Sequence, residues 1–197
     1  GAMVWGTSSN ENFEIDQGDT QVTEQELRRV HLPAFKKAVD SGVMSVMVGL
    51  NSWNNQKLSA NKYLLTDVLK NEMGFTGFIV SDWYAVYEIT ENKYQSTVTA
   101  LNAGIDMIML PYDYQQFTVN LERAVSTGDV SKERLNDAVT RILRVKFALG
   151  LFDRPLQDDA KLSVVGSKDH RELAREVVRK SLVLLKNQQS LVPLKKN

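Results

Sequence analysis

Apolar residues follow two different periods along this chain. Three short, nearly continuous apolar runs, at 43–50, 78–81 and 105–110, have the pattern of buried parallel strands. Between and after them, apolar residues recur at the three- and four-residue spacing of helices, as in 62–73 and 131–149. Strands that alternate with helices about every 30 residues predict an α/β fold with a parallel sheet.

Local signals place the first helix. Thr23 and Glu26 have the spacing of a capping box, and Val22 and Leu27 are placed to pack across it, so the helix is predicted to begin at Thr23. Pro33 is expected to bend or split this helix, because proline lacks the N–H that a helix interior uses.

The sequence predicts three parts. Residues 1–18 combine a remnant of an expression tag with a flexible arm that has no periodicity. Residues 19–150 hold the strand and helix units, and residues 151–197 hold a linker and a C-terminal segment. That segment is predicted to contain a helix and a hairpin, formed by Asp169–Val178 and by Ser181–Leu185 paired with Leu191–Leu194.

Composition excludes several classes of partner. Lys and Arg number 24, and so do Asp and Glu, so no nucleic acid or membrane partner is expected for this soluble domain. The chain has no cysteine, and His31 and His170 stand far apart, so neither a metal centre nor a cofactor is expected. The glycine-rich phosphate loops of doubly wound sheets do not occur, which favours a (β/α) barrel. The cellular compartment stays open.

Chemistry in parallel α/β barrels lies at the carboxyl ends of the strands. The residues just after the three apolar runs are Leu50, Asn51 and Trp53; Ser81, Asp82 and Trp83; and Met109, Pro111 and Tyr112. Taken alone, Asp82 suits a helix cap as well as a functional carboxylate. Trp53 and Trp83 suit core packing as well as stacking on the apolar faces of a sugar ring.

One long stretch carries a family resemblance. Leu64–Lys70, followed by Met73–Trp83, is similar to the signature of glycoside hydrolase family 3, the β-glucosidases and exo-β-glucanases. Further support comes from Ile15–Thr20, Ser45–Met47, Asn51–Asn54, Arg141–Phe147, Gly150–Asp153 and Ser181–Asn187. The resemblance therefore covers nearly the whole chain from Ile15 onward.

The resemblance implies a retaining mechanism in which Asp82 is the nucleophile that attacks the anomeric carbon. It implies that Trp83 lines the subsite for the terminal sugar and that Met47 lies near it. Trp53 and Leu50, just after the first apolar run, are the further candidate substrate-binding residues. It also implies a β-glucoside or oligosaccharide as the substrate and, for many members, secretion or a periplasmic location. A buried, hydrogen-bonded role is expected for Asp106 rather than catalysis.

The chain departs from the family pattern at several sugar-contacting positions. Met3 and Val4 occupy the place of a Lys-His pair, Leu50 that of an aromatic, and Ser59 that of a frequent histidine. The family's acid/base glutamate belongs to a second domain that follows Leu194, and is not expected in this chain. Glu88 and Glu91, which follow the nucleophile, are expected to be helix-surface residues and poor substitutes.

The number of strands suggests how the fold is completed. Three apolar runs make about half of an eight-stranded barrel, so a partial TIM barrel is predicted, completed by a second copy of the chain or by a partner that supplies the other half. The isolated chain is expected to be weak or inactive. The alternative is a catalytically silent half-barrel that serves binding or assembly. A phosphate-binding barrel is disfavoured, because Pro111–Tyr114 makes a poor anion cradle.

Overall fold

The computed structural model describes residues 17–154, 156, 159–190 and 192–194. They divide into two compact units, one that ends at Asp153 and one that begins at Arg154. The predicted tag remnant lies outside the described residues. The first unit contains, in order, β1 (Asp19–Thr20), α1 (Glu24–Glu26), the π-helix η1 (Leu27–His31), α2 (Leu32–Asp40), β2 (Ser45–Val48), β3 (Ser52–Trp53), β4 (Gln56–Lys57), the 3-10 helix η2 (Leu58–Ala60), the π-helix η3 (Tyr63–Glu72), β5 (Phe78–Ser81), the 3-10 helix η4 (Ala85–Glu88), α3 (Lys93–Ala103), α4 (Tyr114–Thr127) and α5 (Lys132–Ala148).

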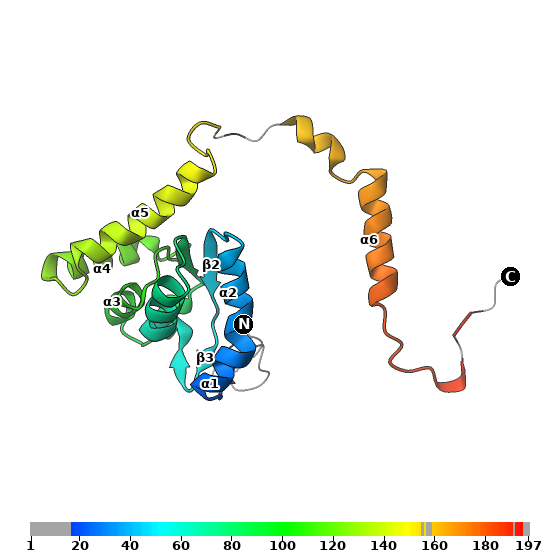
Figure 1. Cartoon of the computed structure of the whole chain (residues 1–197), viewed down its shortest axis with the longest axis horizontal. Helices are drawn as coiled ribbons and strands as arrows, with labels where there is room; N and C mark the ends of the chain where they lie inside the picture. The colour runs from blue at the N-terminus through cyan, green and yellow to red at the C-terminus, as the bar shows by residue number, and fades with distance from the viewer. Residues whose placement is uncertain (1–16, 155, 157–158, 191, 195–197) are drawn as a thin grey trace. The chain divides into compact units, whose positions relative to one another are not determined.

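The strands of the first unit form two small sheets (Figure 1). In one, β2 and β5 pair in parallel along their whole length, from Ser45 opposite Phe78 to Val48 opposite Ser81. In the other, β3 pairs in parallel with β1 and antiparallel with β4. Because helices follow β2 and β5 in the chain, the structure confirms an α/β fold with a parallel sheet.

The prediction of a full strand over residues 105–110 is wrong. This segment meets β5 only at a single parallel bridge, between Val80 and Met107. The carboxylate of Asp106 accepts the Ile79 N–H at 2.8 Å, in place of a backbone carbonyl. The Ile105 carbonyl accepts from Arg134 instead, at 2.9 Å. A side chain therefore replaces part of the ladder that the apolar run predicted.

The predicted helices form close to their expected bounds. The Thr23 hydroxyl accepts the Glu26 N–H at 3.2 Å, so the predicted cap is confirmed. Pro33 lies in the first turn of α2, directly after the π-helical η1. The helix therefore continues past Pro33, and its hydrogen bonding changes from the π to the α pattern just before this residue. No backbone N–H is left unpaired at Pro33, because proline has no N–H.

One apolar core lies between the parallel strands and the helices that follow them. Its buried members are Val48, Leu65, Leu69, Phe75, Ile79, Val86, Ala100, Ala103 and Ile105. A smaller cluster joins α3 to α4 through Leu101 and Ala124. At Gly77 a Cβ would lie 2.2 Å from the carbonyl oxygen of Met44, so only glycine fits where β5 begins beside β2.

The second unit contains the 3-10 helix η5 (Asp159–Val164), α6 (Lys168–Ser181) and the 3-10 turn η6 (Gln188–Ser190). α6 confirms the predicted helix and is capped by the Ser167 hydroxyl. The predicted hairpin does not form in the described residues after α6, which contain no strand, and Leu191 of its second strand lies outside them. The Asn187 side chain satisfies both the C=O and the N–H of Val192, at 2.8 and 3.1 Å, which are the groups that a ladder would use.

Within the described residues, no helix combines the length and the apolar character that a membrane crossing requires.

Candidate active site

Asp82 stands directly after β5, and its carboxylate is held by its own turn. Its Oδ1 accepts the Trp83 N–H at 2.6 Å, and its backbone carbonyl accepts the Ala85 N–H at 3.3 Å. Among the residues that the structure describes, Oδ2 has no hydrogen-bond partner. η4 is capped by Tyr84, without a side-chain bond, so Asp82 is not the helix cap that the sequence also allowed. One carboxylate oxygen is therefore anchored and the other is available.

The turn after β5 is fastened to the segment 107–109. The Met107 carbonyl accepts the Ser81 N–H at 2.9 Å, and the Met109 carbonyl accepts the Tyr84 N–H at 3.1 Å. The buried Ser81 hydroxyl accepts the Met109 N–H at 2.8 Å and donates to the Asp82 carbonyl at 3.0 Å. Sequence reasoning named Ser81 among the residues after the second apolar run but gave it no role, although a lone hydroxyl at the end of such a run is a signal for such a contact.

Aromatic side chains stand beside Asp82. Trp83 is 51% exposed, and its ring meets those of Tyr84 and Tyr112 edge to face at 6.3 and 6.4 Å. Tyr84 takes a left-handed φ of +58°, which a non-glycine residue adopts only at a cost. Burial, and then the nearby Asp113 carboxylate, raise the pKa of Tyr84. Three aromatic rings are thus gathered at the turn that carries Asp82.

Met47 and Trp53, also predicted to contact sugar, lie on different sheets of the first unit. Met47, on β2, is 56% exposed and stands opposite Val80 in the strand register. Trp53, on β3, donates its indole N–H to the Val22 carbonyl at 3.0 Å and stacks on Tyr63. Met47 and Trp53 both line a groove of about 550 Å³ between α2, β2 and η3, and neither Asp82 nor Trp83 lines it. The structure therefore does not gather the four residues into one cavity.

Four further residues were identified from the sequence as departures from the family pattern or as poor substitutes for the acid/base group: Leu50, Ser59, Glu88 and Glu91. Leu50 is half-buried and its carbonyl accepts from Lys57, while Ser59 is buried. Glu91 is exposed, as predicted. Glu88 is not a free surface residue: it is half-buried and accepts from Gln17 at 2.9 Å and from Lys57 at 3.0 Å. Met3 and Val4 lie outside the described residues.

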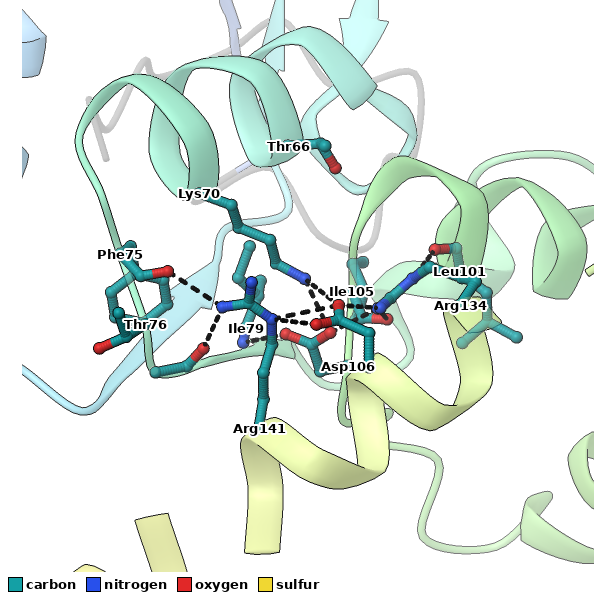
Figure 2. A network of polar contacts seen from close by, with 12 residues as sticks. Thr66, Lys70, Phe75, Thr76, Ile79, Leu101, Ile105, Asp106, Arg134 and Arg141 are labelled. Carbon is teal, nitrogen blue, oxygen red and sulfur yellow. Dashed lines mark hydrogen bonds and ion pairs between the residues drawn. The ribbon is translucent and has the colours of Figure 1, made fainter. Parts of the chain in front are cut away.

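A charged cluster lies near the other end of β5 (Figure 2). The Asp106 carboxylate accepts from Lys70 and from the Ile79 N–H, both at 2.8 Å, and from Arg134. Arg141, further along α5, donates to the carbonyls of Phe75 and Gly77 at 3.0 Å (Figure 2). The predicted buried, hydrogen-bonded role of Asp106 is confirmed.

Electrostatics within this cluster are dominated by burial. Burial lowers the pKa of Lys70, and the attraction of Asp106 only partly opposes it, since Arg134 and Arg141 repel the ammonium. Sequence reasoning missed these three cations, although Arg134 and Arg141 stand two turns apart on α5 and so share a face.

No group of three or more histidine or acidic side chains that could hold a metal ion occurs in the part of the chain that the structure describes. The arrangement at the carboxyl end of β5 consists of a half-anchored carboxylate beside an exposed indole. Such a carboxylate can act as a nucleophile or as a base.

The chain is similar in sequence and in fold to several known proteins. Residues 5–145 match the glycosyl hydrolase family 3 N-terminal domain. A β-xylosidase of Formosa agariphila is 35% identical over 192 residues, which cover 91% of this chain and 27% of that protein. A periplasmic β-glucosidase of Salmonella typhimurium is 36% identical over 187 residues, covering 89% and 24%.

Solved structures give the same result. An exo-1,3/1,4-β-glucanase from a Pseudoalteromonas species superposes with a TM-score of 0.77 at 43% identity, covering 90% of this chain and 23% of that one. A β-glucosidase from Listeria innocua, in complex with glucose, superposes with a TM-score of 0.74 at 32% identity, covering 89% and 25%. The chain thus spans between 23% and 27% of the length of these four relatives. From its motifs, its fold and these matches, the chain belongs to glycosyl hydrolase family 3, and its residues 5–145 correspond to the N-terminal domain of that family.

Proposed function

We propose that this chain carries the nucleophile of a retaining, β-glucosidase-like glycoside hydrolase, and that Asp82 is that nucleophile. The observation that carries the proposal is the half-anchored Asp82 carboxylate at the carboxyl end of a parallel strand, which is where barrel enzymes keep their chemistry. The exposed ring of Trp83 stands next to it and offers an apolar face to a sugar.

The reaction forms one bond and breaks one in each of two steps. Asp82 Oδ2 attacks the anomeric carbon while the glycosidic C–O bond breaks, and the leaving oxygen takes a proton from a second carboxylic acid. Water, activated by that second group, then releases the sugar from Asp82. In retaining enzymes the two carboxyl groups lie about 5–5.5 Å apart.

The acid/base group comes from outside the residues described here. Glu88 is a poor candidate because its carboxylate is already engaged by Gln17 and Lys57. Loss of a general acid costs about 10²–10⁴ in rate, so the chain by itself turns over ordinary glucosides weakly or not at all. An activated aryl leaving group needs less protonation, which leaves the first step open to test.

The barrel is completed by other strands, from a second copy or from a partner chain. Support comes from the apolar groove between α2, β2 and η3, where Val30, Phe35 and Met47 are exposed. Light scattering on the chain is expected to give a dimer or higher species, and a stable monomer would contradict self-association.

Labelling with an activated 2-deoxy-2-fluoro-β-glucoside tests the nucleophile. The expected result is a slowly formed covalent adduct located on Asp82 by peptide mass spectrometry, without steady turnover of an aryl β-glucoside. Asp82→Asn should form no adduct, and Asp67→Asn, at an exposed carboxylate on η3, should label like the unchanged chain. Absence of any adduct would favour the catalytically silent half-barrel.

A further inference from the structure

Ser81 contacts two separate segments from a fully buried position. Its hydroxyl accepts the Met109 N–H at 2.8 Å and donates to the carbonyl of Asp82 at 3.0 Å. A buried hydroxyl is costly unless both of its hydrogen-bonding roles are used, and here both are used.

The peptide group between Asp82 and Trp83 links this hydroxyl to the carboxylate. Its carbonyl oxygen is held by Ser81 and by the Ala85 N–H, at 3.0 and 3.3 Å. Its N–H, which belongs to Trp83, donates to Asp82 Oδ1 at 2.6 Å. The peptide group is planar, so a bond that fixes the direction of the C=O also fixes the direction of the N–H.

We propose that Ser81 is a positioning residue for the Asp82 carboxylate. It fixes the plane of the Asp82–Trp83 peptide against the segment 107–109, and through the Trp83 N–H it fixes the rotamer that leaves Oδ2 free. A misplacement of about 1 Å at a reacting atom costs up to about a hundredfold in rate, so this link matters for attack on a sugar. The consequence for the reaction rests on the proposed function of Asp82.

Ser96 provides a matched control. Its side chain is also fully buried, and its hydroxyl likewise makes two backbone hydrogen bonds, accepting from Thr90 N–H and donating to the Thr90 carbonyl, both at 3.1 Å. Ser96→Ala therefore removes a comparable pair of backbone hydrogen bonds, together with a contact to the Thr90 hydroxyl at 3.2 Å, from a position on α3 with no hydrogen bond to the turn after β5.

The first readout is the rate of adduct formation at Asp82 with the activated fluoroglucoside. Both variants should lower the melting temperature to a similar degree, but only Ser81→Ala should slow labelling, by about tenfold or more, with Ser96→Ala within about twofold of the unchanged chain. Equal labelling rates in the two variants would overturn the proposal.

The second readout does not depend on any reaction. Amide exchange followed by NMR should accelerate at Trp83 in Ser81→Ala and stay unchanged there in Ser96→Ala. Trp83 is the decisive site because Ser81 does not bind its N–H directly. An unchanged Trp83 amide would refute the positioning role even if no chain forms an adduct, whereas a faster Trp83 amide without any adduct would remove only the proposed function of Asp82.

Discussion

Two carboxylates flank β5, and they lie in opposite environments. The Asp106 carboxylate is fully buried and accepts from Lys70, Arg134 and the Ile79 N–H near the start of the strand. The Asp82 carboxylate stands at the other end, is only half-buried and accepts one N–H, from its neighbour. The difference separates a group that holds the fold from one that is free to act.

This division follows the polarity of parallel α/β folds. Residues at the amino-terminal face of a barrel sheet serve stability, and residues at the carboxyl face serve chemistry. In this chain Arg134 and Arg141 of α5 bind backbone carbonyls at the amino-terminal face. The carboxyl face carries the exposed rings of Trp83 and Tyr112. Substitutions at the two ends should therefore have effects of different kinds.

Asp106→Asn should have the largest effect on stability. It removes the anion that compensates two largely buried cations, and breaking such a pair costs about 3–5 kcal/mol of unfolding free energy. Urea denaturation monitored by circular dichroism would measure it. Asp169→Asn, an exposed carboxylate on α6, is the control and should change little. A loss below that of an ordinary surface mutant would mean that the cluster does not hold the fold.

Gly77→Ala should come next. A Cβ there would lie 2.2 Å from the Met44 carbonyl oxygen and 2.7 Å from the Phe75 ring, so β2 and β5 must separate, at a cost of about 1–3 kcal/mol. Gly74→Ala meets no atom within 4 Å and pays only for its left-handed φ of +74°. Denaturation midpoints should rank Gly77→Ala as the less stable of the two.

Lys70→Met tests the buried cation through pH. Burial lowers the pKa of Lys70 in the folded chain, so the unfolded chain binds more protons just below the ordinary lysine pKa. Stability from this group is therefore present above that ordinary pKa and is lost as pH falls through the lowered one. Unfolding free energy should rise with pH in this window more steeply in the unchanged chain than in Lys70→Met, by at most about 1.4 kcal/mol per pH unit. Parallel curves would contradict this origin of the shift.

Trp53→Phe should have a smaller effect. It keeps the stacking on Tyr63 but loses the bond to the Val22 carbonyl, at a cost of about 1 kcal/mol. Labelling of Asp82 should be unaffected by this change, since Trp53 lines the groove from which Asp82 is absent. Slower labelling in Trp53→Phe, at unchanged stability, would instead support its predicted place in the sugar site.

Asp82→Asn should have the smallest effect on stability, within about 0.5 kcal/mol, because the amide oxygen can still accept the Trp83 N–H. The same substitution at Asp106 is expected to be severe, so the two variants form a direct test of the comparison between the ends of β5. Similar losses of unfolding free energy in both would show that the two carboxylates share a structural role.

Much of the fold could be predicted from local patterns. Thr23 caps the first helix as its capping-box spacing indicated, because a cap depends on atoms within one turn. The apolar run at 78–81 became β5, since the strand period is likewise local. The apolar runs at 105–110 and 181–185 were predicted to be strands, but they do not form full strands. The Asp106 side chain bonds the Ile79 N–H and the Asn187 side chain bonds the Val192 carbonyl, which are backbone groups that a strand ladder needs.

The candidate site was predictable only in part. Asp82 and Trp83 were identified because they follow β5 and carry a family motif. Glu88 was placed on a free surface, yet it is engaged by Gln17 and Lys57, and the former lies 71 residues away in the chain. Contacts at such separation leave no periodic trace, because each partner looks like an ordinary polar residue in its own segment.

The sequence by itself determined the strands β2 and β5, most of the helices and the presence of a carboxylate directly after β5, because these rest on neighbours along the chain. Only the tertiary structure decided which polar groups are anchored. It gave Asp106 three donors, left Asp82 with one, and set the Ser81 hydroxyl between two segments. The physical reason is that hydrogen bonds and burial depend on what packs across the sheet, and packing joins residues that the chain keeps far apart.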